Sequence, residues 1–572
     1  LTNGVDRNKL PILGKAPDKN TLSRHDGVQE YPTITTLSES PLTPNVLWVG
    51  TDDGNLQVTR DGGKIWKNVA GKQPGVPKGT YVSRVVASKT GEGAAFATFD
   101  GHRSDDYGIY IFATTDYGET WKSIRNGIPD SAGTMHVIRE HPRNTNLLFA
   151  GTEFGLWVSW DRGANWTALK NNFPTVPVDD IEIQARENDL VLATHGRSIW
   201  IFDDLAPIEK MDGNVTNSPL TFFPPRTATT WFTRQRRWSA GQQMFTAKNP
   251  PYGALLSYCL KEAIPPEAPK TNKDDNKDAP QERPRSGARA EAAEKKEGRV
   301  KITVLDKDGK VIRELDGPGA AGVNRTNWDL RENPPGEPTP EQQEAIAAGF
   351  GFGPRGPLVE PGEYTVKIKA GDKEATQKVT VEDDNRVTIS AADRATRHEA
   401  IEKLYAMAKT TDKDRRTIEG MQTALTNARE EWKKEAAKKD ATKIPEDIVK
   451  AADELQKKAD GVAEKFIRPR QVLGNAGPPL EWKPDPLPNQ VQSLLNDLDG
   501  FSAAPDGQQQ EKLVELTTLV GDASTAVKGV SDDLAALNKK MNDAGIPHII
   551  PAPPRPRTEP GDGEDLDRVD RF

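Results

Sequence analysis

Short apolar segments alternate with turn residues from position 31 to about 205, a pattern typical of β-strands joined by tight turns. Segment 47–54 parallels segment 148–155, and a proline stands six positions before each, at Pro41 and at Pro142. A repeat of this kind predicts a β-propeller in which each four-stranded blade is one repeat. The predicted innermost strands of four blades are 33–37, 82–87, 135–139 and 180–183.

A turn motif recurs three times within this repeat. It has Ser or Thr first, Asp two positions later, Gly two after that and Trp three further on. The carboxylate can accept backbone N–H groups in the turn, Gly can adopt positive φ, and Trp can fill the space between sheets. The fourth blade, which contains 190–200, lacks a full copy. We predict structural roles for Thr59, Asp61, Gly63 and Trp66, for Thr114, Asp116, Gly118 and Trp121, and for Ser159, Asp161, Gly163 and Trp166.

The pattern changes twice after the propeller segment. Alternating apolar positions at 301–305 and 311–315, on either side of a turn at 306–309, predict a β-sandwich. The opening Pro361-Gly362-x-Tyr364 is common in Ig-like modules, so we expect the sandwich to be Ig-like. From Ser390 onward the apolar residues recur at helical spacing, which predicts a bundle of three or four helices. The predicted fold class is therefore mainly β with an α-helical C-terminal part.

These patterns also predict domain boundaries. We expect an irregular N-terminal arm at 1–30, propeller blades at 31–210, the sandwich at 215–385 with a disordered insertion at 262–298, the helical bundle at 390–545, and a disordered acidic, Pro-rich tail at 546–572.

Composition narrows the expected partners. The 572 residues carry a formal net charge of −8, so no overall positive charge attracts nucleic acid or an anionic membrane. No apolar run is long enough to span a bilayer. Cys259 is the only cysteine, which excludes an intrachain disulfide and a cysteine-based metal cluster. The sequence opens on Leu1, which indicates a mature, trimmed or fragmentary product.

Ionisable residues in the turns are the candidate ligand-binding groups. Asp52, Asp53 and Glu153 stand at equivalent places in two blades, where a shared role in the turn is the simpler interpretation. Segment 100–106 departs from the repeat, as binding loops of propellers do, but solvation or pairing between blades explains its charges as well. The charged residues at the end of blade four likewise either bind a ligand or serve the turn. The candidates in segment 100–106 and at the end of blade four are Asp100, His102, Arg103, Asp105, Asp106, His195 and Arg197.

Motifs for cofactor chemistry are not found in the sequence. No second His lies at metal-ligand spacing from His195, and there is no phosphate loop, nucleophile elbow or dinucleotide fingerprint. We expect no metal and no cofactor. A glycosidase needs two carboxylates roughly 5 to 10 Å apart, and sequence alone does not assign such a pair, so the catalytic residues stay unassigned.

The three turn motifs resemble the Asp-box, or BNR repeat, of sialidases, xyloglucanase-type glycosidases and sortilin-type propellers. With segments 47–54 and 193–200 and the C-terminal parts, nearly the whole chain resembles the C-terminal portion of large bacterial BNR-repeat proteins with a sortilin-like propeller. The resemblance implies export to the periplasm, cell surface or medium, and a glycosyl hydrolase label. A sialidase is not expected, because its arginine cluster and Tyr-Glu nucleophile pair are not found in these blades.

Three hypotheses follow. The first is an exported, non-catalytic binding or scaffold protein whose partner is another polypeptide or further N-terminal blades of the same protein, since four blades alone would leave sheet faces uncovered. The second is a carbohydrate-active hydrolase with two catalytic carboxylates. The third is peptide binding in the propeller channel. A cleft with an acidic pair and exposed aromatic rings would favour the second, and an unpaired channel arginine would favour the third.

Overall fold

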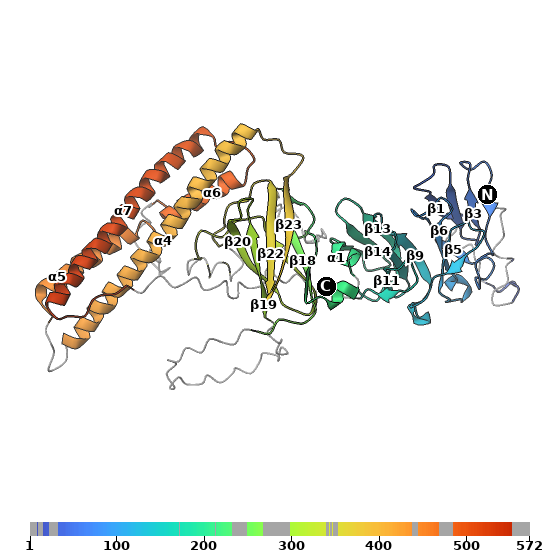
Figure 1. Cartoon of the computed structure of the whole chain (residues 1–572), viewed down its shortest axis with the longest axis horizontal. Coiled ribbons are helices and arrows are strands. Elements are labelled where there is room, and N and C mark those ends of the chain that lie inside the picture. Colours follow the sequence, from blue (N-terminus) through green and yellow to red (C-terminus); the bar gives the residue numbers. More distant parts are fainter. Residues whose placement is uncertain are drawn as a thin grey trace.

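The structure is a computed structural model, and it describes residues 9, 15–21, 32–170, 172–211, 213–231, 249–266, 298–338, 343, 346, 353–436, 444–467 and 484–551. Sheets that are antiparallel except for one parallel pair, β17 with β23, make up the N-terminal and central parts, and helices make up the C-terminal part, which confirms the predicted order of β and α structure. Figure 1 shows the parts in a row along the longest axis. Most of the predicted arm, insertion and tail lies outside the described residues.

Four antiparallel sheets, here called blades I to IV, follow one another along the chain. Blades I to III each have four strands in chain order, and blade IV has three. Blade I comprises β1 (Ile34–Glu39), β2 (Leu47–Thr51), β3 (Leu56–Thr59) and β4 (Lys67–Asn68). Blade II comprises β5 (Tyr81–Ala87), β6 (Ala95–Asp100), β7 (Tyr110–Thr114) and β8 (Lys122–Ser123). Blade III comprises β9 (Met135–Glu140), β10 (Leu148–Thr152), β11 (Gly155–Ser159) and β12 (Thr167–Ala168), and blade IV comprises β13 (Val178–Gln184), β14 (Asp189–Thr194) and β15 (Ile199–Phe202).

Apolar side chains pack between successive blades and form three separate cores. Blade I packs on blade II, blade II on blade III, and blade III on blade IV, so the described blades form an open series. Trp48 and Val82 belong to the first core, Phe96 and Ile138 to the second, and Phe149 to the third. A single blade cannot bury both of its faces, so its stability depends on its neighbours.

The three predicted turn motifs adopt one geometry, and we call them the box turns (59–66, 114–121 and 159–166). In the second, the Thr114 hydroxyl donates to Asp116 over 2.8 Å, and the Gly118 N–H donates to Thr114 over 3.1 Å. Asp116 also accepts from the Thr120 N–H over 3.0 Å. Gly118 has φ of 80°, which only glycine adopts without strain. The first and third box turns repeat these bonds.

Replacing Asp116 by Asn should destabilise blade II by about 1 kcal/mol, because the charge-assisted bonds of the turn weaken. Burial alone would raise the pKa of Asp116, but hydrogen bonds from Thr120 and Thr114 outweigh it and lower that pKa below 3.8. The difference from wild type should persist above pH 3.8 and disappear as the pH falls through the lowered pKa. Melting temperatures of both proteins across acid pH test this. A difference that stays constant throughout that range would contradict it.

Two sheets face each other after blade IV and share one apolar core, which includes Leu256 and Trp328 from one sheet and Ile302 and Val366 from the other. The short helices α1 (Ala206–Glu209) and α2 (Gly213–Asn217) lead into them. One sheet has the order β16 (Leu220–Phe222), β18 (Ala254–Leu260), β21 (Gly322–Trp328). The other has the order β17 (Ala228–Thr230), β23 (Lys373–Asp383), β22 (Gly362–Ala370), β19 (Arg299–Leu305), β20 (Val311–Pro318).

Among the described residues, four helices form the C-terminal part and share one core with Ile546 and Ile549, two residues of the predicted tail. Asp506 caps the last helix, since it accepts from the Gln509 N–H while the Gln509 side chain accepts from the Asp506 N–H. Figure 1 shows the two longest helices running side by side. The helices are α4 (Ala391–Ala436), α5 (Glu446–Ala463), α6 (Leu487–Asp499) and α7 (Gly507–Asp543).

Two half-buried arginines join the three parts. Arg325 on β21 donates to the carbonyl oxygens of Asp203 and Asp204 at the end of blade IV, over 2.6 Å each. Arg331 donates to Asp499 of α6 over 2.5 Å. Each arginine therefore ties the packed sheets to a different neighbour.

Candidate functional site

Four of the predicted site residues occupy one position of the repeat, at the end of the second strand of each blade. Asp52, Glu153 and His195 each donate their backbone N–H to the residue before the first strand of their own blade, over 3.0, 3.1 and 3.0 Å. Asp100 is the last residue of β6 and pairs with Tyr81. These turns lie at the same end of their blades, so the candidates belong to one edge of the blade series.

In blade I the carboxylates stabilise their own turn. Asp52 is buried and accepts the Thr33 N–H over 2.7 Å. Asp53 accepts the side-chain amide of Asn55 over 2.8 Å and a bond from the Thr51 hydroxyl. Both carboxylates therefore have partners within blade I.

In blade II most of the charged side chains of segment 100–106 also have local partners. Asp100 is 4 % exposed and lies 2.7 Å from Nδ1 of His102. The Arg103 guanidinium stacks on the ring of Tyr81, with 4.6 Å to the centroid. Asp105 is exposed in the left-handed region, with φ of 59°.

Asp106 belongs to the same segment and holds its outer turn. It accepts the Gly108 N–H over 3.0 Å and the Tyr110 hydroxyl over 2.9 Å. Burial, with this hydrogen bond to Asp106, raises the pKa of Tyr110 to about 12. The Tyr110 hydroxyl therefore stays protonated and serves as a donor.

Glu153 and His195 are connected through His136 and Asp179, two residues that were not predicted from the sequence. Nε2 of His136 lies 2.9 Å from Glu153, and its Nδ1 lies 3.7 Å from Asp179. Asp179 in turn lies 3.3 Å from Nδ1 of His195. His136 and Asp179 are the residues at the register shifts near the starts of β9 and β13, and Asp179 lies one position before the predicted strand 180–183.

A second ionic cluster joins the inner strands. Arg84 lies 2.7 Å from Asp180, and Arg139 lies 2.9 Å from Glu182 and 3.7 Å from Asp180. Both arginines are thus paired with carboxylates of blade IV. Among the other candidates, Arg197 is exposed on the turn before β15, where its carbonyl accepts the indole N–H of Trp200 over 3.0 Å.

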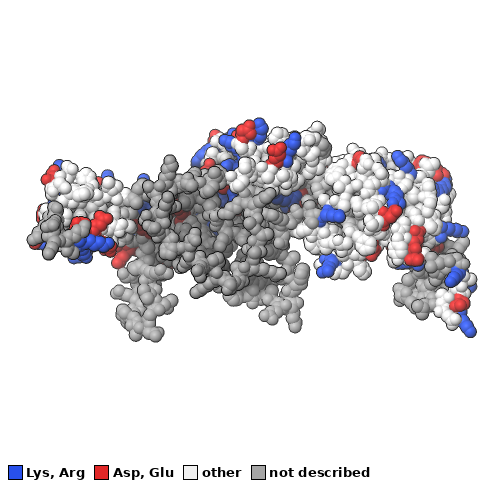
Figure 2. Space-filling view, turned by 90° about the horizontal axis from the view of Figure 1, so that it is seen from below, with Lys and Arg blue, Asp and Glu red and all other residues white. Residues whose placement is uncertain are grey.

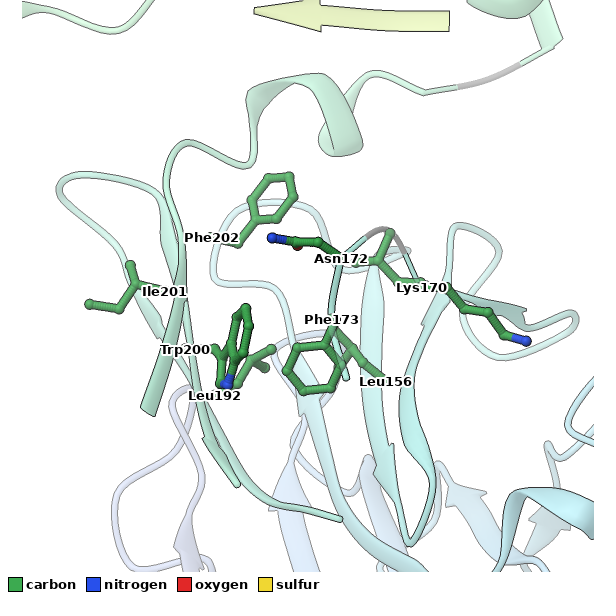
Figure 3. A pocket seen from close by; sticks show the side chains of 9 residues that line it. Leu156, Lys170, Asn172, Phe173, Leu192, Trp200, Ile201 and Phe202 are labelled. Atoms are coloured by element: carbon green, nitrogen blue, oxygen red, sulfur yellow. The ribbon is translucent and has the colours of Figure 1, made fainter. Parts of the chain in front are cut away.

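A small apolar pocket lies beside β15, between blades III and IV (Figure 3). Trp200 and Phe173 meet edge to face with 5.5 Å between ring centroids. Both rings line the pocket, and the other residues that line it are Leu156, Leu169, Lys170, Asn172, Leu192, Ile201 and Phe202. The lining offers one amine and one amide but no carboxylate, so the pocket suits an apolar or aromatic group and not acid–base chemistry.

Three further observations concern the residues that the structure describes. No group of three or more His, Cys, Asp or Glu side chains is placed to hold a metal ion among them. No described helix combines the length and the apolar character needed to cross a bilayer. On the face in Figure 2, positive and negative side chains are interspersed over the described surface.

Comparisons with known proteins relate the chain to propellers. No family model matches it. The chain is 30 % identical over 105 residues to an oligoxyloglucan-reducing end-specific xyloglucanase of Emericella nidulans. The matched segment is 18 % of this chain and 11 % of that protein. The chain is 22 % identical over 146 residues to vacuolar protein sorting/targeting protein 10 of Leptosphaeria maculans, covering 25 % and 9 % respectively. The chain thus spans about a tenth of the length of these curated relatives.

Solved structures overlap with the chain only in part. The GH74 enzyme of Niastella koreensis has a TM-score of 0.25 at 15 % identity, with 38 % of this chain and 28 % of that chain covered. YCF48 of Cyanidioschyzon merolae has a TM-score of 0.21 at 18 % identity, with 31 % and 62 % covered. Together with the repeated sheets, the sequence relatives support a propeller-type domain.

Proposed function

We propose that the chain is an exported, non-catalytic binding or scaffold protein built on a propeller of Asp-box blades. The observation that carries this proposal is that the carboxylates at the candidate edge are already engaged. Asp52 holds the Thr33 N–H, Asp100 holds His102, and Glu153 holds His136. A hydrolase of the two-carboxylate type needs an acid and a base free to reach a sugar bond.

Glycoside hydrolysis is the second candidate, because the sequence is similar to the xyloglucanases. In that case Asp100 and Glu153 are the first residues to test, since they end β6 and follow β10 at the same edge. Peptide binding in the channel has less support, because the inner arginines Arg84 and Arg139 are paired with Asp180.

Incubation with xyloglucan oligosaccharides separates the first two candidates. We expect no new reducing ends above a no-protein control. Isothermal titration calorimetry with the same oligosaccharides then measures whether the chain binds them. Turnover that falls at least a hundredfold in Glu153→Gln or Asp100→Asn would establish the hydrolase instead. Lys64→Gln in an exposed box turn serves as the matched control and should leave any turnover unchanged.

A further inference from the structure

Blade I exposes apolar side chains where the following blades bury theirs. Leu37 pairs with Val49 and is 62 % exposed. Its counterparts at the same register are Val85, Ile138 and Ile181, which are at most 1 % exposed. Those three are buried where a preceding blade packs on their own blade. Leu37 therefore lies on the kind of face that another blade covers.

Ile34 at the start of β1 shows the same difference. It is 47 % exposed and pairs with Thr51. Its counterparts Val82, Met135 and Val178 are fully buried. Two strand positions of blade I, Ile34 and Leu37, thus define an open apolar face.

Trp66 in the first box turn adds a third position. It is half-buried, whereas Trp121 and Trp166 in the other box turns are buried. Each of these two packs on the preceding blade: Trp121 meets Trp48 edge to face at 6.1 Å, and the Trp166 indole donates to the Ile124 carbonyl over 2.6 Å. Trp66 has no preceding blade among the described residues. Its indole lies where the other two find a partner.

The packing also defines what the partner must present. Trp121 packs on Trp48, and Trp166 shares its core with Phe96. Trp48 and Phe96 stand at the same register in the middle of the second strand, opposite Ser38 and Val86. An aromatic ring at this position of a partner blade would meet Trp66 edge to face, the arrangement that aromatic pairs favour.

A second copy of this chain does not supply that ring. Blade IV is the described blade whose following face is uncovered, with Ile199 at 65 % and Ile201 at 56 % exposure. At the register of Trp48 and Phe96 it carries Val191. A head-to-tail copy would therefore bring valine to Trp66, which leaves the aromatic contact unmade.

We propose that the open face of blade I binds a further Asp-box blade, which lies outside this 572-residue sequence and presents an aromatic ring from the middle of its second strand. Ile34, Leu37 and Trp66 form the chain's side of this interface. The proposal rests on the propeller part of the proposed function and is independent of what the propeller binds.

Photocrosslinking in the particle isolated from the producing organism tests the proposal. Leu37 is replaced by p-benzoylphenylalanine during synthesis in that organism, so the photoreactive group is in place before the interface forms. We expect a crosslink to a peptide absent from this sequence, in a segment that carries further Ser/Thr-x-Asp-x-Gly-x-x-Trp motifs. The matched control, with p-benzoylphenylalanine in place of Val514 on the exposed face of α7, should give no such peptide.

A charge substitution gives a second readout. Leu37→Asp should lower recovery of the crosslinked or co-purifying segment at least tenfold, with the melting temperature of the isolated chain unchanged because Leu37 is exposed in it. No crosslink, or a crosslink to residues 1–31 or to a second copy of the chain, would overturn the proposal. Failure of the sugar-binding assay leaves this crosslink unaffected, so the two proposals fail separately.

Discussion

Arg325→Ala should destabilise the junction between blade IV and the packed sheets by about 3 kcal/mol. The side chain makes two 2.6 Å bonds to the carbonyls of Asp203 and Asp204 and a 3.1 Å bond to Ser257. Burial lowers the pKa of Arg325, and the nearby Asp204 and Asp203 act against that effect. Alanine leaves two carbonyls without their charged donor, and bonds to charged groups are worth about 1.5–3 kcal/mol each.

Hydrogen exchange measured by mass spectrometry reports the loss of stability at the junction itself. The N–H groups of Asp204 and Leu205, which donate to Asp189 and Asn188, should exchange roughly a hundredfold faster in the variant. Arg186→Ala removes an arginine that is 78 % exposed and should change little. Unchanged exchange at these amides in Arg325→Ala would show that the junction does not depend on the guanidinium.

Asp499→Ala should have a comparable effect at the opposite end of the packed sheets, about 3–5 kcal/mol. Asp499 is 3 % exposed, accepts from Arg331 over 2.5 Å and from the Leu358 N–H over 2.9 Å, and lies 3.9 Å from Arg397. Its removal leaves the half-buried Arg331 guanidinium without its carboxylate and takes one of two nearby carboxylates from the buried Arg397. We expect the helices to melt separately from the sheets, as an added transition in differential scanning calorimetry.

Two further substitutions test whether the buried charge of Asp499 is the cause. Asp499→Asn keeps an acceptor for the Leu358 N–H and loses only the charge, so its transition should fall between wild type and Asp499→Ala. Asp533→Ala removes one partner of an exposed ion pair with Lys458 and should cost less than 1 kcal/mol. If Asp533→Ala were as damaging as Asp499→Ala, burial would not be the cause.

Local patterns in the sequence predicted the local structure well. The turn 306–309 joins β19 and β20, and Asp306 accepts from the N–H groups of Asp308 and Lys310 over 2.9 Å each. Apolar residues that recur at helical spacing along α4, including Ile401, Leu404 and Leu425, are buried. These features depend on residues a few positions apart, which periodicity and turn chemistry describe.

Contacts between distant residues could not be predicted in the same way. Arg325 reaches residues more than 120 positions earlier, and Arg397 and Asp412 are buried in α4 among positions that the apolar stripe leaves polar. From sequence alone a charged residue is predicted to be solvent-exposed, because its buried partner is not known. The cluster of His136 and Asp179 with the predicted Glu153 and His195 escaped for the same reason, because it forms only when blades III and IV meet.

The direction in which the box tryptophans pack has a consequence for synthesis on the ribosome. Trp121 and Trp166 both pack on the blade that precedes them in the chain. Each new blade therefore emerges after the surface that its tryptophan needs has already been made. Folding can proceed from the N-terminus, blade by blade, without waiting for downstream sequence. A ribosome that stalls after blade II would leave Trp121 already covered by blade I, and the following face of blade II open to chaperones.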